Sequence, residues 1–109
     1  MIYLAAPYSD PDPVIVQARM EIIYHAMGIF MKEGRHVVTP LFMHEVAVRH
    51  NLDGTYDYWE KYCLDILKRC DEMIVLCLPG WTKSRGIKGE IEFCQYHNIK
   101  VTFIECNED

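Results

Sequence analysis

The stretch that most constrains the fold is a short apolar run followed directly by a turn and a helix. Residues Met73 to Leu78 are apolar, include β-branched side chains and are few enough to form a buried strand. Pro79-Gly80 ends this strand, and Ser84 can cap the helix that follows. The segment therefore predicts a strand, a turn and a helix N-terminus that meet at one place.

The same alternation continues along the whole chain. Strands are expected at residues 1–6, 36–40, 73–78 and 99–105, and helices at 14–33, 58–70 and 84–97, with a possible short helix at 41–48 and a loop from Asn51 to 57. Strands that alternate with helices of this length predict βαβ units and right-handed crossovers. We therefore predict an α/β fold of three layers, in which a parallel sheet of about four to five strands is flanked by helices in a Rossmann/flavodoxin-like arrangement.

The first helix is long, and its ends carry recognisable signals. Pro13 suits the first turn, Asp10 or Asp12 can cap it, and Gly34 is suited to the C-terminal cap. An apolar stripe at helical spacing predicts the face that packs on the sheet. Its members are Ile15, Ala18, Ile22, Ala26, Ile29 and Phe30.

Length, charge and cysteine content limit the number of domains, the partners and the cellular compartment that we expect. A chain of 109 residues predicts one domain over residues 1–109, and a formal net charge of −5 argues against a nucleic-acid polymer as partner. The five cysteines contain no Cys-x-x-Cys, which favours free thiols in a reducing compartment. Pro7 interrupts the apolar N-terminus, so we expect a cytoplasmic protein without a membrane segment.

A ligand site is expected where the strands end. In parallel sheets ligands sit beyond the carboxyl ends of the strands, at the switch point in strand order. The loops at those ends are Ala6-Pro7-Tyr8-Ser9, Thr39-Pro40-Leu41-Phe42 and Pro79-Gly80-Trp81. On the helix after the third loop, Glu90 shares a flank with Cys94 and should point toward the protein, whereas Glu92 should face solvent.

These features resemble the nucleoside 2-deoxyribosyltransferases and the related deoxynucleoside-monophosphate N-glycosidases. The resemblance is carried by the opening strand and loop Tyr3-Leu4-Ala5-Ala6-Pro7-Tyr8-Ser9, by Asp71 before the third strand, and by Ser84-x-Gly86-x-x-x-Glu90 after it. It is closest to short members of the superfamily with Leu-Pro-Gly-Trp-x-x-Ser-x-Gly-x-x-x-Glu. It spans nearly the whole chain in element order, and the last motif is its most specific part.

The resemblance implies a role for several residues. Glu90 would be the nucleophile that attacks the anomeric carbon of 2-deoxyribose, and Tyr3 would orient it. Ser84 and the helix N-terminus would contact the 5′ end of the sugar, and Gly86 would let the ligand approach the backbone. Further substrate contacts are expected from the strand-end loops, at Ala6, Pro7, Tyr8, Phe42, Gly80 and Trp81. For Phe42 and Trp81, ordinary packing is the alternative.

One position departs from the resemblance. Many of these enzymes carry an aspartate in the helix before the third strand, which holds a sugar hydroxyl or protonates the leaving base, and this position is Cys63 here. Asp57, at the start of the same helix, is the geometrically better stand-in, because Asp65 lies on a different side of the helix.

Two functions are compatible with these residues, and Cys63 in place of the expected aspartate is the reason to consider the second. The first is an enzyme that cleaves or exchanges the N-glycosidic bond of a 2′-deoxynucleoside or its 5′-monophosphate without a cofactor. The second is a catalytically inactive nucleotide-binding module of the same fold. A receiver-like signalling domain fits less well, because paired acidic residues do not follow the first strand, and the histidines show no metal-binding spacing. The resemblance also implies a homodimer or a larger homo-oligomer.

Overall fold

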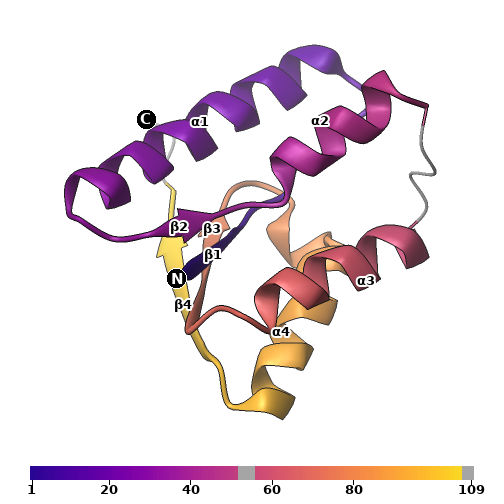
Figure 1. Ribbon diagram of the computed structural model, residues 1–109. Helices are drawn as coiled ribbons and strands as arrows, with labels where there is room; N and C mark the ends of the chain where they lie inside the picture. Colours follow the sequence, from indigo (N-terminus) through magenta and orange to yellow (C-terminus); the bar gives the residue numbers. More distant parts are fainter. Residues whose placement is uncertain (52–55, 107–109) are drawn as a thin grey trace.

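The protein forms one parallel sheet with helices on both faces. The computed structural model describes residues 1–51 and 56–106, without the side chains of residues 42, 44, 45, 48 and 56–58. Within these residues four strands pair in parallel in the order β2-β1-β3-β4. The strands are β1 (Ile2–Ala5), β2 (Val37–Val38), β3 (Glu72–Cys77) and β4 (Lys100–Glu105). The predicted three-layer α/β fold is confirmed (Figure 1).

The helices lie close to their predicted positions. They are α1 (Pro13–Lys32), α2 (Leu41–Arg49), α3 (Tyr56–Leu67) and α4 (Arg85–His97), with a short 3₁₀ turn, η1 (Trp81–Lys83), before α4. The stretch after β2, for which a short helix was only a possibility, forms α2. The predicted loop from Asn51 to 57 lies largely outside the described residues, and its last two positions belong to α3.

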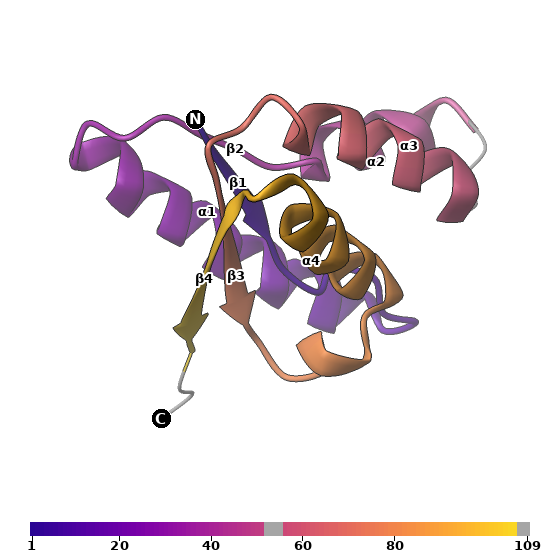
Figure 2. The same ribbon diagram turned by 90° about the horizontal axis from the view of Figure 1, so that it is seen from below.

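Side chains of β1 alternate between two cores, one on each face of the sheet. Leu4 packs with Ile23 of α1 on one face. Tyr3 packs with Leu67 and Cys94, next to α3 and α4, on the other face. Figure 2 shows α4 in front of the sheet and α1 behind it. Because both faces are covered, the central strands are apolar throughout, as the sequence indicated.

The strand order places a switch point between β1 and β3. From β1 the chain runs through α1 to β2, whereas from β3 it runs through α4 to β4 on the opposite side of the sheet. The loops that follow β1 and β3 therefore diverge above two neighbouring strands. This divergence leaves a crevice at their carboxyl ends, the usual position of a ligand in such sheets.

The ends of α1 follow the predicted capping pattern. Asp12 is the N-cap, and its side chain accepts a hydrogen bond from Val14 N at 2.9 Å. Asp10 instead accepts from Asp12 N and so stabilises the preceding turn. Gly34 has a φ of +80°, the left-handed conformation that glycine adopts most readily after a helix.

The predicted inward face of α1 is partly wrong. Ile15 and Ile29 are 40% and 45% exposed, and Ala18 is also exposed, whereas Ile23 and Phe30 are buried. The helix carries apolar residues around most of its circumference, so their spacing fixes its period but not its direction. Ile22, Ala26 and Phe30 of the predicted stripe do pack against the core, and Ile23 joins them, so the prediction is wrong only for Ile15, Ala18 and Ile29.

By length and composition alone, α1 is a helix that could cross a membrane. The helix of a soluble protein passes the same test, so this property does not distinguish the two cases. In this structure α1 packs on the sheet through Ile23 and Phe30. The cytoplasmic location expected from the sequence stays a prediction.

Candidate functional site

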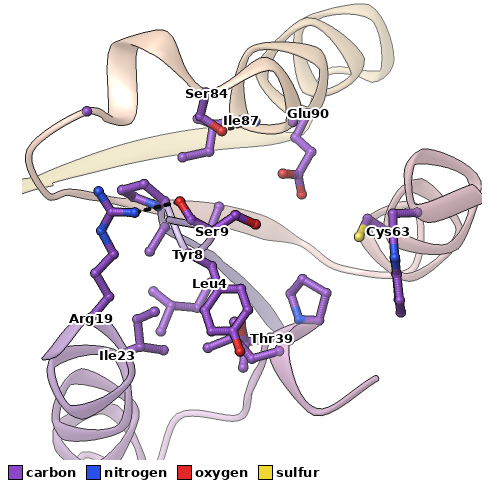
Figure 3. A pocket seen from close by; sticks show the side chains of 18 of the residues that line it. Leu4, Tyr8, Ser9, Arg19, Ile23, Thr39, Cys63, Ser84, Ile87 and Glu90 are labelled. Atoms are coloured by element: carbon purple, nitrogen blue, oxygen red, sulfur yellow. Dashed lines mark hydrogen bonds between the residues drawn. The ribbon is translucent and has the colours of Figure 1, made fainter. Parts of the chain in front are cut away.

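A cavity of about 510 Å³ opens at the carboxyl ends of β1, β2 and β3, where the strand order predicts a ligand site. Figure 3 shows side chains from α1, α3, α4 and the loop after β1 around it. The cavity is lined by Leu4, Ala5, Ala6, Pro7, Tyr8, Ser9, Arg19, Ile23, Thr39, Pro40, Leu41, Trp59, Cys63, Gly80, Lys83, Ser84, Gly86, Ile87 and Glu90.

Glu90 points its carboxylate into this cavity (Figure 3). The start of α4 is fixed by Ser84, whose Oγ accepts a hydrogen bond from Ile87 N at 3.2 Å. Ile87 and Cys94 of the same helix are buried against the sheet, which turns the flank that carries Glu90 inward, as the sequence predicted. Glu92 is exposed, also as predicted.

The Glu90 carboxyl group is poorly solvated. Its Oε2 is buried and has no hydrogen-bond partner among the described residues. Burial raises the pKa of Glu90 to about 7, because the charged form loses water, and the nearby Tyr3 hydroxyl lowers that pKa by a smaller amount. The side chain is therefore close to equally protonated and ionised at neutral pH, the condition in which a carboxyl group can both accept and release a proton.

Tyr3 lies behind Glu90 rather than in the cavity wall. Its side chain is fully buried on β1, and its hydroxyl has no partner at hydrogen-bond geometry within the described part of the chain. Burial raises the pKa of Tyr3 far above its ordinary value, and the charge of Glu90 and the Cys63 thiol raise it further. The phenol therefore stays protonated and can act only as a donor toward the carboxylate. This placement is compatible with the orienting role that the resemblance implies.

Cys63 of α3 lines the cavity on the far side from Arg19 (Figure 3). Burial raises the pKa of its thiol to about 11; proximity to the Tyr3 hydroxyl lowers that pKa, and the charge of Glu90 raises it. At neutral pH the group is thus a neutral thiol. A neutral thiol with this pKa is a weak acid, so it is a poor replacement for the aspartate expected at this position.

Most of the predicted binding residues meet in the cavity. Ala6, Pro7, Tyr8, Gly80, Ser84 and Gly86 all line it. Gly80 has a φ of +93°, so the turn after β3 uses a conformation that other residues adopt only with strain. A Cβ at Gly86 would meet only Ser84 Oγ, at 3.9 Å, which leaves the space over this backbone available to a ligand.

Besides Tyr3, three predicted site residues are not placed among the described lining residues of the cavity. Trp81 is not among the described lining residues, and its ring lies 5.5 Å from that of Phe103. The side chains of Phe42 and Asp57 lie outside the described residues, so their roles stay predictions. Asp71, part of the resemblance, is exposed at the opposite end of β3 and accepts a hydrogen bond from the N-terminal amine at 2.7 Å.

Sequence reasoning missed the cations of the site, Arg19 and Lys83. Arg19 projects from α1 and reaches the loops after β1 and β3: its Nη1 donates to Ser9 O at 2.9 Å and its Nη2 to Pro79 O at 3.3 Å. The available signal was its position four residues before the buried Ile23, which puts a cation on the inward side of the helix.

Among its described lining residues, the cavity therefore combines one acidic side chain with two basic ones. Glu90 is its single carboxylate among the described lining residues. No group of three or more His, Cys, Asp or Glu side chains that could hold a metal ion occurs within residues 1–51 and 56–106. What the described site offers chemically is a carboxyl group that titrates near neutrality, with hydrogen-bond donors and positive charge around it.

The fold and the cavity define an α/β protein of the Rossmann-like class with a candidate ligand site at the switch point. Residues 1–106 match the model of a family described as a domain of unknown function (DUF1937), and the chain belongs to that family. No similar sequence was found among curated proteins. The family description specifies no activity, so the likeness to deoxyribosyltransferases stays a prediction.

Proposed function

We propose that the protein cleaves or exchanges the N-glycosidic bond of a 2′-deoxynucleoside or its 5′-monophosphate. The observation that carries this proposal is the Glu90 carboxyl group, which points into the cavity with a buried oxygen that has no hydrogen-bond partner among the described residues. An uncompensated polar group of this kind is costly for the free protein. The cost of this unpaired carboxyl oxygen is offset only if a ligand or the reaction interacts with it.

In the proposed reaction the ionised Glu90 attacks the anomeric carbon of the sugar. A covalent glycosyl-enzyme forms as the bond to the base breaks, and water or a second base then takes the sugar and releases the carboxylate. The buried phenol of Tyr3, held protonated, stabilises the carboxylate from behind. A pKa of about 7 leaves a large fraction of Glu90 ionised at neutral pH.

The experiment is an incubation of the protein with a panel of deoxynucleosides and deoxynucleoside 5′-monophosphates, each with and without a second free base. Chromatography detects released or exchanged bases. Glu90→Ala should abolish both reactions, and Glu92→Ala, a change of the same kind at an exposed position of the same helix, should leave them intact. Unchanged turnover in Glu90→Ala would exclude the nucleophile.

A second candidate function is nucleotide binding without chemistry. The observation that favours it is Cys63, a neutral thiol at the position of an expected acid, because glycosidases generally use a second carboxyl group to activate the leaving group. In this case a nucleotide raises the melting temperature, but no base is released under any condition of the panel.

We also propose that the protein is a homodimer or a larger homo-oligomer, as the resemblance implies. The exposed apolar side chains of α1 are compatible with a subunit contact, since Val14 is 74% and Met31 64% exposed. Light scattering after size exclusion at micromolar concentration tests this. A strictly monomeric mass would contradict it.

A further inference from the structure

The cavity has a cationic side that the sequence motifs do not explain. Arg19 and Lys83 both line it, in a chain whose formal net charge is −5. Neither side chain forms an ion pair with a carboxylate among the described residues. Two uncompensated cations in one concave site raise the local potential and favour an anionic ligand there, whatever the overall charge of the protein.

Arg19 is held in place with much of its donor capacity unused. A guanidinium group carries five N–H donors, and two of them bind the carbonyl oxygens of Ser9 and Pro79. The other three have no acceptor among the described residues. Gly80 lies over the guanidinium, because a Cβ there would come within 3.7 Å of Nη2. The two backbone contacts thus fix the direction of the group and leave its remaining donors for a ligand.

The N-terminus of α4 adds further donors to the same cavity. Ser84 Oγ already accepts from Ile87 N, but the N–H of Gly86, a lining residue, has no acceptor among the described residues. Free N–H groups in the first turn of a helix are suited to bind the oxygens of an anion. Figure 3 shows Arg19 on one side of the cavity, Ser84 above it and Glu90 further along.

We propose that Arg19, Lys83 and the start of α4 bind a phosphate monoester, so that the ligand is a deoxynucleoside 5′-monophosphate and not the free nucleoside. This inference rests on the proposed function and assigns its substrate class. Guanidinium, ammonium and backbone donors that line one cavity suit the three terminal oxygens of a phosphate, which carries close to two negative charges at neutral pH. Arg19 and Lys83 are then the residues that determine specificity for the phosphate.

The test compares the binding of each deoxynucleoside with that of its 5′-monophosphate by calorimetry. The wild type should bind the monophosphate about 10- to 100-fold more tightly, the range expected from hydrogen bonds to charged groups. Inorganic phosphate should compete with the monophosphate but not with the nucleoside, and added salt should weaken only the monophosphate. Equal affinity for the two ligands would overturn the proposal.

Two variants locate the effect. Arg19→Gln should remove about tenfold or more of the affinity for the monophosphate and leave nucleoside affinity within about twofold. Arg69→Gln is the matched control, because it removes the same charge from an exposed pair with Asp65 outside the cavity. An equal loss for both ligands in Arg19→Gln would mean that Arg19 only supports the loops, and would overturn its assignment.

Lys83→Gln keeps the inference testable if Arg19→Gln does not fold, because the Lys83 side chain is exposed and makes no described contact that the fold needs. It should weaken the monophosphate alone, by about threefold to tenfold. These binding measurements need no turnover. If the protein prefers the monophosphate but releases no base, the glycosidase activity is refuted and the phosphate site stands. If it turns over nucleosides and monophosphates equally, the glycosidase activity stands and the phosphate site is refuted.

Discussion

The two sides of the cavity differ in how their polar groups are satisfied. On the Glu90 side, the carboxyl oxygen Oε2 and the Tyr3 hydroxyl are buried and lack hydrogen-bond partners among the described residues. On the Arg19 side, the charged group is only partly buried and is anchored by two backbone carbonyls. The Glu90 side therefore holds buried polar groups without partners, which is unfavourable, whereas the Arg19 side holds a charge that backbone carbonyls stabilise.

This difference separates two tasks that one site must perform. Burial raises the pKa of Glu90 to about 7 and that of Cys63 to about 11, so that side controls where protons reside. On the other side, Arg19 is anchored by two backbone carbonyls and its charge attracts an anionic ligand, so that side contributes to binding. Each prediction below changes one property of the Glu90 side and tests whether that side controls protonation.

The largest effect is expected from Glu90→Gln, which keeps the shape of the side chain but removes its negative charge. Base release or exchange should fall by about 10³-fold or more, because no other carboxylate among the described residues lines the cavity. Initial rates on the best substrate of the panel measure this loss. Glu92→Gln should retain the full rate, and a loss below about tenfold in Glu90→Gln would remove the nucleophile from the proposal.

The next effect concerns stability. The pKa of Glu90 is raised on folding, so the folded protein binds the proton more tightly than the unfolded chain. This contribution is fully present below the ordinary glutamate pKa of 4.5 and is lost as the pH rises through about 7, a change of about 3 kcal/mol.

Urea unfolding of the wild type and of Glu90→Gln at several pH values isolates this contribution. The wild type should lose stability relative to the variant as the pH rises from about 4 to 8. Glu92→Gln should follow the wild type. Parallel curves for the wild type and Glu90→Gln would show that Glu90 has an ordinary pKa.

Cys63 should react slowly with alkylating agents. With its pKa raised to about 11, the thiolate fraction at pH 7 is about 10²-fold smaller than in a free cysteine. Mass spectrometry of the digested protein after timed treatment with iodoacetamide gives the rate, and Cys63→Ser identifies its peptide. The rate should rise with pH throughout the range in which the protein is folded. Alkylation as fast as that of a free cysteine would indicate a thiolate and a differently charged cavity.

The smallest effect is expected from Tyr3→Phe. The Tyr3 hydroxyl lowers the pKa of Glu90, so its removal should raise that pKa further. Carbon NMR of the Glu90 carboxyl group measures the pKa without any requirement for turnover. Tyr96→Phe, at an exposed position of α4, should change nothing. A downward shift in Tyr3→Phe would mean that the hydroxyl does not contact the carboxylate.

Periodicity and end signals were enough to predict the layers of this fold. The apolar run before Pro79, the cap at Ser84 and the glycine at position 34 each fixed an element end through local chemistry. The inward direction of Glu90 followed from its place beside Ile87 and Cys94, which are both buried. These features depend on residues that are close in sequence, so they can be predicted from the sequence alone.

What sequence reasoning missed depends on packing between distant segments. The inward face of α1 was predicted only in part, because apolar residues surround the helix and only contact with the sheet selects Ile23 over Ile15. Arg19 was overlooked for the same reason, since its contact with Pro79 joins residues 60 positions apart. Trp81 lies at the predicted end of the sheet, but its ring lies near Phe103, a partner that the local pattern does not indicate.

The central place of β1 in the sheet also bears on how the protein is made. β1 pairs with β2 on one side and with β3 on the other, although β3 begins only at Glu72. As the chain leaves the ribosome, β1 can pack with α1 but cannot pair with β3 until more than half of the protein has emerged. Tyr3 and Glu90 then come together only when α4 packs on the sheet, so the site is completed in the same late step as the fold.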